Sequence, residues 1–162
     1  MDKKLEKAFN DQIKNEFYSG YLYLAMAAFA ESNNLPGFAK WFKVQYKEEI
    51  SHGMKMFEFL HDKGARVHLQ AIPEPAFDFA SVQELFVETL KHEKKVTSLI
   101  ESLSDLAKKV DDKAAEIFLQ WFITEQVEEE KNASAILDTL KIIKPDSAAL
   151  IMLDRELGKR EG

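Results

Sequence analysis

The 162-residue chain has no cysteine, only six glycines and four prolines, and no apolar run long enough to cross a membrane. Without cysteine, the chain cannot form disulfides, a thiolate zinc site or a thiol nucleophile. Acidic residues outnumber basic ones by 28 to 22, and the resulting net charge of −6 argues against a nucleic-acid surface. The charged start MDKKLEKAFNDQIKNEF lacks a signal-peptide core. We therefore expect a cytoplasmic protein that binds neither membrane nor nucleic acid.

Apolar residues make up 46% of the chain and recur at three- and four-residue steps along most of it. No stretch alternates as a strand would, and no Pro/Gly/Ser-rich linker divides the chain. The pattern predicts helices over residues 5–32, 36–63, 81–109, 113–144 and 147–157. We therefore predict an all-α protein with one domain over 1–162, formed by a four-helix bundle over 5–144 and a short fifth helix over 147–157.

The segment 64–80 contains Pro73 and Pro75 and is predicted to be extended. Its roughly 17 residues can reach about 55 Å, whereas a helix of about 28 residues is about 42 Å long. The segment can therefore run the length of the bundle. Helices 36–63 and 81–109 then lie parallel, while the short turns form two antiparallel hairpins.

Residues with known preferences for helix ends mark the predicted boundaries. Pro36 suits the first turn of the second helix, and Gly64 can cap its end. Ser81, followed by Glu84 three residues later, forms a capping-box pattern at the start of the third helix.

Polar residues interrupt the apolar seams of the long helices. The seam of the second helix reads Phe38, Phe42, Gln45, Glu49, His52, Met56 and Phe59. Glu49 and His52 follow Glu16 by 33 and 36 residues, and Gln126 and Glu129 follow Glu93 by the same intervals. Two hairpins therefore carry one polar pattern at an offset of 77, and these side chains are predicted to meet in the middle of the bundle. Glu125 lies on or near the same edge of its helix as Glu129.

A glutamate on a helix usually faces water, and this is the alternative for each of these residues taken singly. Four carboxylates gathered in the interior would be strongly destabilising, because burial of one unpaired ion costs several kcal/mol. Protons relieve part of this repulsion, and bound cations relieve it without loss of the charge. Four carboxylates with one imidazole suit a pair of ferrous ions better than zinc or calcium. We therefore predict a metal site.

Di-iron carboxylate bundles take one glutamate from each of two helices and a Glu-x-x-His motif from each of the other two. This chain has one such motif, Glu49-Ile50-Ser51-His52, and Gln126-Val127-Glu128-Glu129 in place of the second. With the stretches EFYSGYLYLAMA, EEISHGMKMFEFL and EQVEEE, it resembles the non-haem bacterial and archaeal ferritins over nearly its whole length. The resemblance implies an iron-storage protein with ferroxidase activity, which oxidises Fe(II) with dioxygen or hydrogen peroxide and deposits ferric mineral in a cage.

The resemblance also implies roles for single residues. Glu16, Glu49 and His52 would hold the first iron of a di-iron centre, and Glu49, Glu93 and Glu129 the second, with Glu49 as the bridge. Gln126 matches a position close to the second iron, and Tyr23 matches the tyrosine beside the first. Glu48, Glu125 and Glu128, with Glu129 shared, match a third iron site. The alternative for these last residues is that the charged run simply faces water.

Departures from related families narrow the prediction. Haem-containing bacterioferritins carry Met after the bridging glutamate and His in the second motif, where this chain has Ile50 and Glu129, so no haem is expected. Rubrerythrin-like proteins need a cysteine-bound iron domain, and the DNA-protecting mini-ferritins lack the fifth helix. His61, His68 and His92 complete no predicted ligand set, and His92 is expected at the surface.

The helix over 147–157 is apolar around most of its circumference and too short to persist alone in water. It packs either on its own bundle or, as the resemblance implies, around the fourfold axes of a 24-subunit shell. Two other functions stay open: a di-iron or di-manganese oxidase or peroxidase that forms only a small oligomer, and a purely structural bundle whose central carboxylates are protonated.

Overall fold

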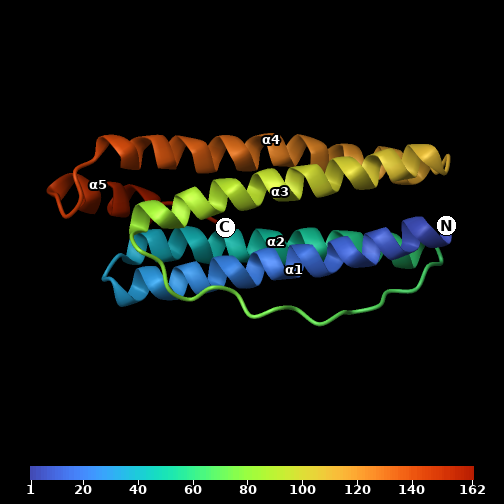
Figure 1. Cartoon of the computed structure of the whole chain (residues 1–162), viewed down its shortest axis with the longest axis horizontal. Coiled ribbons are helices and arrows are strands. Elements are labelled where there is room, and N and C mark those ends of the chain that lie inside the picture. Colours follow the sequence, from blue (N-terminus) through green and yellow to red (C-terminus); the bar gives the residue numbers. More distant parts are fainter.

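The computed structural model describes all residues, 1–162, and its regular elements are helices only (Figure 1). They are α1 (Lys3–Ser32), α2 (Pro36–Asp62), α3 (Val82–Lys109), α4 (Lys113–Ile142) and α5 (Ala148–Leu157). The predicted all-α fold, with four long helices and a short fifth one, is confirmed. The helix bounds agree with the predicted ones to within two residues.

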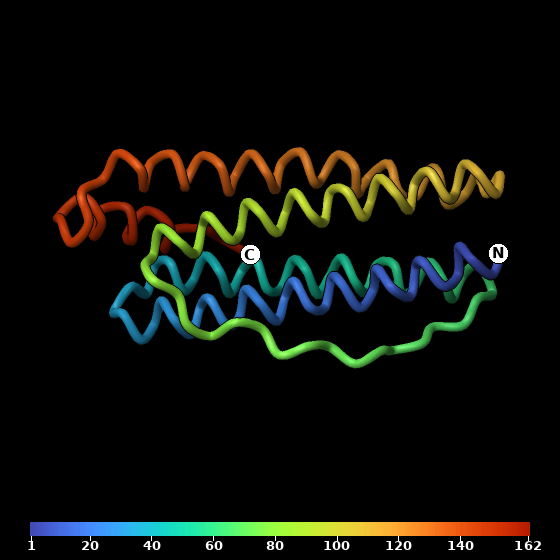
Figure 2. Tube along the Cα trace, viewed as in Figure 1, coloured from blue at the N-terminus to red at the C-terminus, as the bar shows by residue number.

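Helices α1 and α2 pack as one hairpin and α3 and α4 as the other, with α1 also in contact with α3. The segment 63–81 runs along the outside of α1 from one end of the bundle to the other, which leaves α2 and α3 parallel (Figure 2). Asn10 of α1 holds this crossover, because its side chain donates to Arg66 O at 3.1 Å and accepts from His68 N at 2.6 Å. At the other end, the rings of Phe29 and Phe79 pack edge to face.

The predicted helix ends are largely as expected. Pro36 occupies the first turn of α2, and Gly64 follows its end with a φ of +66°, a conformation that favours glycine. The hydroxyl of Ser81 accepts from Glu84 N at 3.1 Å. The carboxylate of Glu84 accepts from Ala80 N and makes no hydrogen bond to Ser81 N, so only half of the predicted capping box forms.

The interior consists of two apolar clusters separated by a polar band. One cluster of 15 buried residues is built around Phe38, Phe42 and Phe86, and the other, of 12, around Phe9 and Leu60. Between them lie the buried carboxylates of the four long helices: Glu16, Glu49, Glu93 and Glu129. Because close-packed cores resist deformation, the clusters on either side hold this band in place.

Helix α5 packs against the start of α2 through Asp154. The residue before α2, Leu35, offers no side-chain cap. Asp154 Oδ1 supplies it instead and accepts from Gly37 N at 2.8 Å and Phe38 N at 3.0 Å. The other face of α5 stays uncovered, with Met152 71% exposed. Helix α5 therefore packs on its own bundle and still presents an apolar surface.

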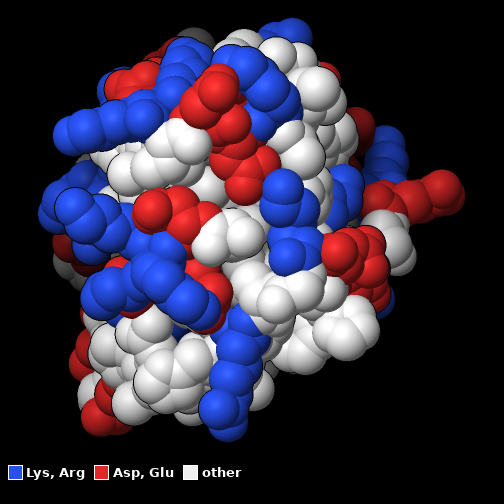
Figure 3. All heavy atoms as spheres, turned by 90° about the vertical axis from the view of Figure 1, so that its right-hand side faces the viewer, with Lys and Arg blue, Asp and Glu red and all other residues white.

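The opposite end of the bundle, where α1 and α4 begin, carries basic and acidic side chains side by side (Figure 3). Lys63 of α2 pairs there with Asp112 at 2.9 Å, and Lys113 pairs with Asp111 and Glu116. None of the helices is long and apolar enough to span a membrane.

Candidate metal centre

The α1–α2 hairpin brings three predicted ligands into one buried group. Ligand atoms of Glu16, Glu49 and His52 all lie within 4.8 Å of one another. His52 Nδ1 is 3.6 Å from Glu49 Oε2 and 3.9 Å from Glu16 Oε2. Glu49 and His52 share a face of α2 because they are three residues apart. These atoms are arranged around a point that a cation can occupy.

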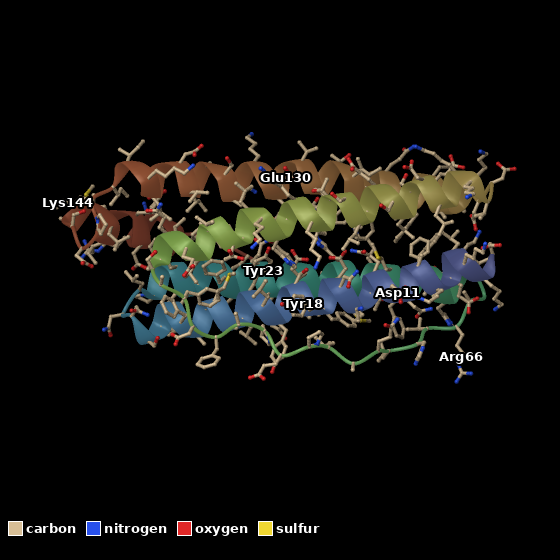
Figure 4. All side chains as sticks on the ribbon, viewed as in Figure 1. Asp11, Tyr18, Tyr23, Arg66, Glu130 and Lys144 are labelled. Carbon is tan, nitrogen blue, oxygen red and sulfur yellow. The ribbon has the colours of Figure 1, made fainter.

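The α3–α4 hairpin presents its two carboxylates differently, since neutral hydrogen-bond donors hold each of them. Tyr23 lies in the interior between α1 and α3 (Figure 4), and its hydroxyl donates to Glu93 Oε1. Gln126 Nε2 donates to Glu93 Oε2 at 3.1 Å. Gln45 Nε2 donates to Glu129 Oε2 at 2.6 Å and lies 3.4 Å from Glu49 Oε1. Gln45 therefore links the carboxylates of the two hairpins.

Burial and mutual repulsion raise the pKa of every central carboxyl group. Burial, followed by the charge of Glu49, raises the pKa of Glu16 to about 8. Burial and the charges of Glu93 and Glu129 raise the pKa of Glu49. Burial and Glu93 raise the pKa of Glu129 to about 7. The pKa of Glu93 rises only to about 6, because hydrogen bonds from Tyr23 and Gln126 oppose the effect of burial. Without a cation, the centre therefore binds protons near neutral pH.

Aromatic rings form one wall beside His52. Its imidazole packs edge to face with Trp121, with the ring centroids 5.3 Å apart, and with Phe122, with the centroids 6.0 Å apart. The ammonium of Lys55 lies over Trp121, 3.2 Å from the ring centroid. These contacts hold the imidazole beside the carboxylates.

Residues of the predicted third site are not gathered in one cluster. Glu125 groups with His52 and Glu129, within 4.8 Å. Glu48 instead pairs with Arg160, and Glu128 is exposed. The third site stays a prediction.

A model of the ferritin-like domain matches residues 6–143. The chain belongs to the ferritin family. A bacterial non-heme ferritin of Staphylococcus aureus is 39% identical over 160 residues, which cover 99% of this chain and 96% of that protein, and the one of Staphylococcus saprophyticus is 41% identical with the same coverage.

Solved ferritin structures have the same fold. An open pore ferritin of Archaeoglobus fulgidus superimposes with a TM-score of 0.98 at 43% identity, over 99% of this chain and 98% of that one. A humanized archaeal ferritin gives 0.99 at 42% identity, over 100% of this chain and 99% of that one. Ferritins store iron and oxidise Fe(II). This ferritin is accordingly an iron-storage protein with ferroxidase activity.

The buried line of α4 in this ferritin passes through Phe122, Gln126 and Glu129. Glu125, expected on or near the same edge of the helix as Glu129, lies half-buried beside this line. Gln126 lies in the interior, where its amide contacts Glu93.

Tyr23 and His92 lie in surroundings that the sequence did not indicate. Tyr23 was predicted beside the first iron, yet its hydroxyl bonds Glu93, the predicted ligand of the second. His92, expected at the surface, is half-buried, because α1 covers part of this side of α3. Its Nε2 lies 2.8 Å from Ser19 Oγ, and its ring packs between Tyr18 and Tyr23. Burial, with a smaller effect of Lys95, lowers the pKa of His92 to about 4.

Several residues that support the centre were missed. Gln12 Nε2 donates to Glu16 Oε1 at 2.7 Å, and its position one turn before Glu16 could have indicated this contact. Thr97 Oγ1 lies 3.3 Å from Gln126 and donates to Glu130 at 2.6 Å, which extends the hydrogen bonds from Glu93 to half-buried Glu130 of α4 (Figure 4). Arg160 contacts Gln45 from beyond α5, where no helical pattern could place it.

Proposed function

We propose that the central carboxylates bind two iron ions within one subunit and that oxidation of Fe(II) takes place there. The first ion would be held by Glu16, Glu49 and His52, and the second by Glu49, Glu93 and Glu129, with Glu49 shared. The observation that carries the proposal is the buried Glu16–Glu49–His52 group, whose ligand atoms lie within 4.8 Å of one another.

The electrostatics of the centre support a pair of cations. Four buried carboxylates have no lysine or arginine among their direct partners, and their pKa values are raised chiefly by burial. Iron ions with open coordination positions would take the place of the protons and accept dioxygen or hydrogen peroxide as oxidant. Oxidation of two Fe(II) ions releases two electrons, which suits two-electron reduction of either oxidant. Tyr23 and Gln126 would orient Glu93 through their hydrogen bonds.

A third iron position would use Glu48, Glu125, Glu128 and Glu129. The grouping of Glu125 with Glu129 and His52 supports part of it. Glu48 would have to leave Arg160 to become a ligand, and Glu128 is free to move because it is exposed. We propose that iron occupies this position as it moves from the di-iron centre to the mineral.

The storage function requires assembly, and we propose a cytoplasmic shell of 24 subunits. The exposed apolar residues support self-association, since Met152 and Ile142 protrude near α5 and Phe77 protrudes from the crossover. Related ferritins of Archaeoglobus fulgidus are described as an open pore form and an engineered closed form, which are terms for an enclosing shell.

Anaerobic titration of the assembled metal-free protein with Fe(II), followed by air, tests the proposal. About two ions per subunit should bind tightly and give a fast diferric absorbance, and loading should then continue inside a particle with a constant number of subunits. Glu49→Ala should remove tight binding and the fast signal, whereas Glu101→Ala, an exposed site on α3, should change neither. Oxidation that stops at the centre of a small oligomer would contradict storage, and wild-type behaviour of Glu49→Ala would contradict the site.

A further inference from the structure

The segment after α5, residues 158–162, continues along α2 in the direction of α5 and ends near the middle of the bundle (Figures 1 and 2). Lys40 Nζ donates to Gly158 O at 2.9 Å, and Gly162 lies against the side chain of Val44. With α5 fixed on α2 by Asp154, this path directs the side chain of Arg160 toward the edge of the proposed iron site.

Arg160 makes several contacts that together fix its guanidinium. Nη1 donates to Gln45 Oε1 at 2.9 Å, and Nη2 pairs with Glu48. The guanidinium carbon lies 4.5 Å from the ring centroid of buried Trp41. Only 20% of the Arg160 side chain is exposed. A guanidinium suits this place, since its planar fork serves two acceptors while its face stacks on an aromatic ring.

Gln45 lies between Arg160 and the carboxylates, and it is 1% exposed. Its Oε1 accepts from Arg160, and its Nε2 donates to Glu129 and lies within 3.4 Å of Glu49. The reversed amide would place Oε1 against two carboxylates and its N–H groups against the guanidinium. Arg160 thus allows one amide orientation only.

We propose that Arg160 is a positioning residue of the iron site, which holds Gln45 so that the amide N–H groups fix Glu129 and Glu49 in the arrangement that receives cations. This inference rests on the proposed di-iron site. It predicts the direction in which cation affinity changes when Arg160 is replaced. Loss of positioning weakens cation binding, whereas loss of a nearby positive charge alone would strengthen it.

Calorimetric titration of the assembled full-length protein with Zn(II), a redox-inert probe, tests this sign. Arg160→Met should lower zinc affinity about 3- to 10-fold, and Gln45→Met roughly 10- to 100-fold, the usual range for partners of metal ligands. Arg160→Lys should behave like Arg160→Met, because an ammonium cannot reproduce the fork. Lys159→Met removes a charge from the same segment, where Lys159 pairs only with Glu156, and should leave affinity unchanged.

The double variant decides whether Arg160 acts through Gln45. If it does, Arg160→Met should cause no further loss of zinc affinity in the Gln45→Met background, where only the loss of its charge remains. Additive losses, unchanged affinity in both Arg160 variants, or tighter binding by the single Arg160→Met variant would overturn the inference. If Arg160→Met fails to assemble, the same comparison holds for Arg160→Lys. Glu49→Ala separates the two proposals. If the Glu49→Ala variant still binds zinc, the proposed di-iron site is wrong. If that variant loses zinc binding while the Arg160 variants bind normally, only the proposed role of Arg160 is wrong.

Discussion

The two helical hairpins carry the same polar pattern, yet they present it to the interior in different ways. In α1–α2, Glu16 and Glu49 face each other and His52, with ligand atoms within 4.8 Å. In α3–α4, Glu93 faces the hydroxyl of Tyr23 and the amide of Gln126. The pKa values follow this difference, since burial and Glu49 raise that of Glu16 to about 8, whereas the hydrogen bonds limit that of Glu93 to about 6.

The comparison shows that equal spacing in the sequence does not give equal halves of a metal centre. The α1–α2 half stores repulsion that a cation relieves, and its ligand atoms already converge. The α3–α4 half stores less repulsion, because hydrogen bonds from neutral donors to Glu93 and Glu129 oppose part of the effect of burial. A cation gains more by entering the first half, so we expect the two positions to fill in order, with the α1–α2 position first.

The largest test of this order removes equivalent glutamates from the two hairpins. Zinc titration of the unaltered protein should show two steps of unequal affinity, for about two ions per subunit. Glu16→Ala should abolish the tighter step and Glu93→Ala the weaker one, because each takes a ligand that the proposed assignment gives to one ion only. If either substitution lowered the zinc affinity of both steps equally, the two steps could not be assigned to separate hairpins.

A second test measures how much the buried carboxylates of each hairpin destabilise the metal-free protein. A carboxyl group with a raised folded-state pKa stabilises the fold fully below its ordinary pKa of 4.5 and loses that contribution as pH rises through the folded value. For Glu16 the loss extends to about pH 8, and for Glu93 it ends near pH 6. At about pH 7 this amounts to on the order of 3 kcal/mol for Glu16 and about 2 kcal/mol for Glu93.

Glu16→Gln cannot ionise and still accepts from Gln12, so it should stabilise the metal-free protein near pH 7 more than Glu93→Gln does. Both variants should match the unaltered protein at about pH 3, well below the ordinary pKa of 4.5, where the carboxyl groups are protonated in both states. Unfolding temperatures with chelator present, recorded across this range, measure the difference. If the rise in unfolding temperature caused by Glu16→Gln does not grow with pH, the charge of the Glu16 carboxylate is not its cause.

The sequence predicted the shared pattern of the hairpins but not their difference. Helical period, turn residues and the offset of 77 were enough for the bundle, its crossover and the meeting of Glu16, Glu49 and His52. The donors that distinguish the halves come from contacts across helices. Tyr23 of α1 and Gln126 of α4 both donate to Glu93 of α3, and His92 is half-buried because α1 packs on α3.

Arg160 illustrates a further limit of the sequence. None of the four central carboxylates has a lysine or arginine as a direct partner. Arg160 lies in a segment with no periodic pattern, and its place follows from Asp154 holding α5 on the start of α2. A capping contact between distant residues cannot be found from local periodicity.

The smallest test changes the donor that most distinguishes the α3–α4 half. Tyr23→Phe removes the hydroxyl that bonds Glu93 and leaves Gln126 as its remaining donor. Glu93 would then be less well oriented, and the weaker zinc step should lose about 10-fold in affinity, the lower end for a partner of a metal ligand. The tighter step should not change, because Glu16 and His52 do not contact this hydroxyl. Tyr18→Phe is the matched control, since Tyr18 packs on His92 and makes no hydrogen bond to a central carboxylate. A loss confined to the tighter step would reverse the assignment and return Tyr23 to the first iron position, as the sequence resemblance implied.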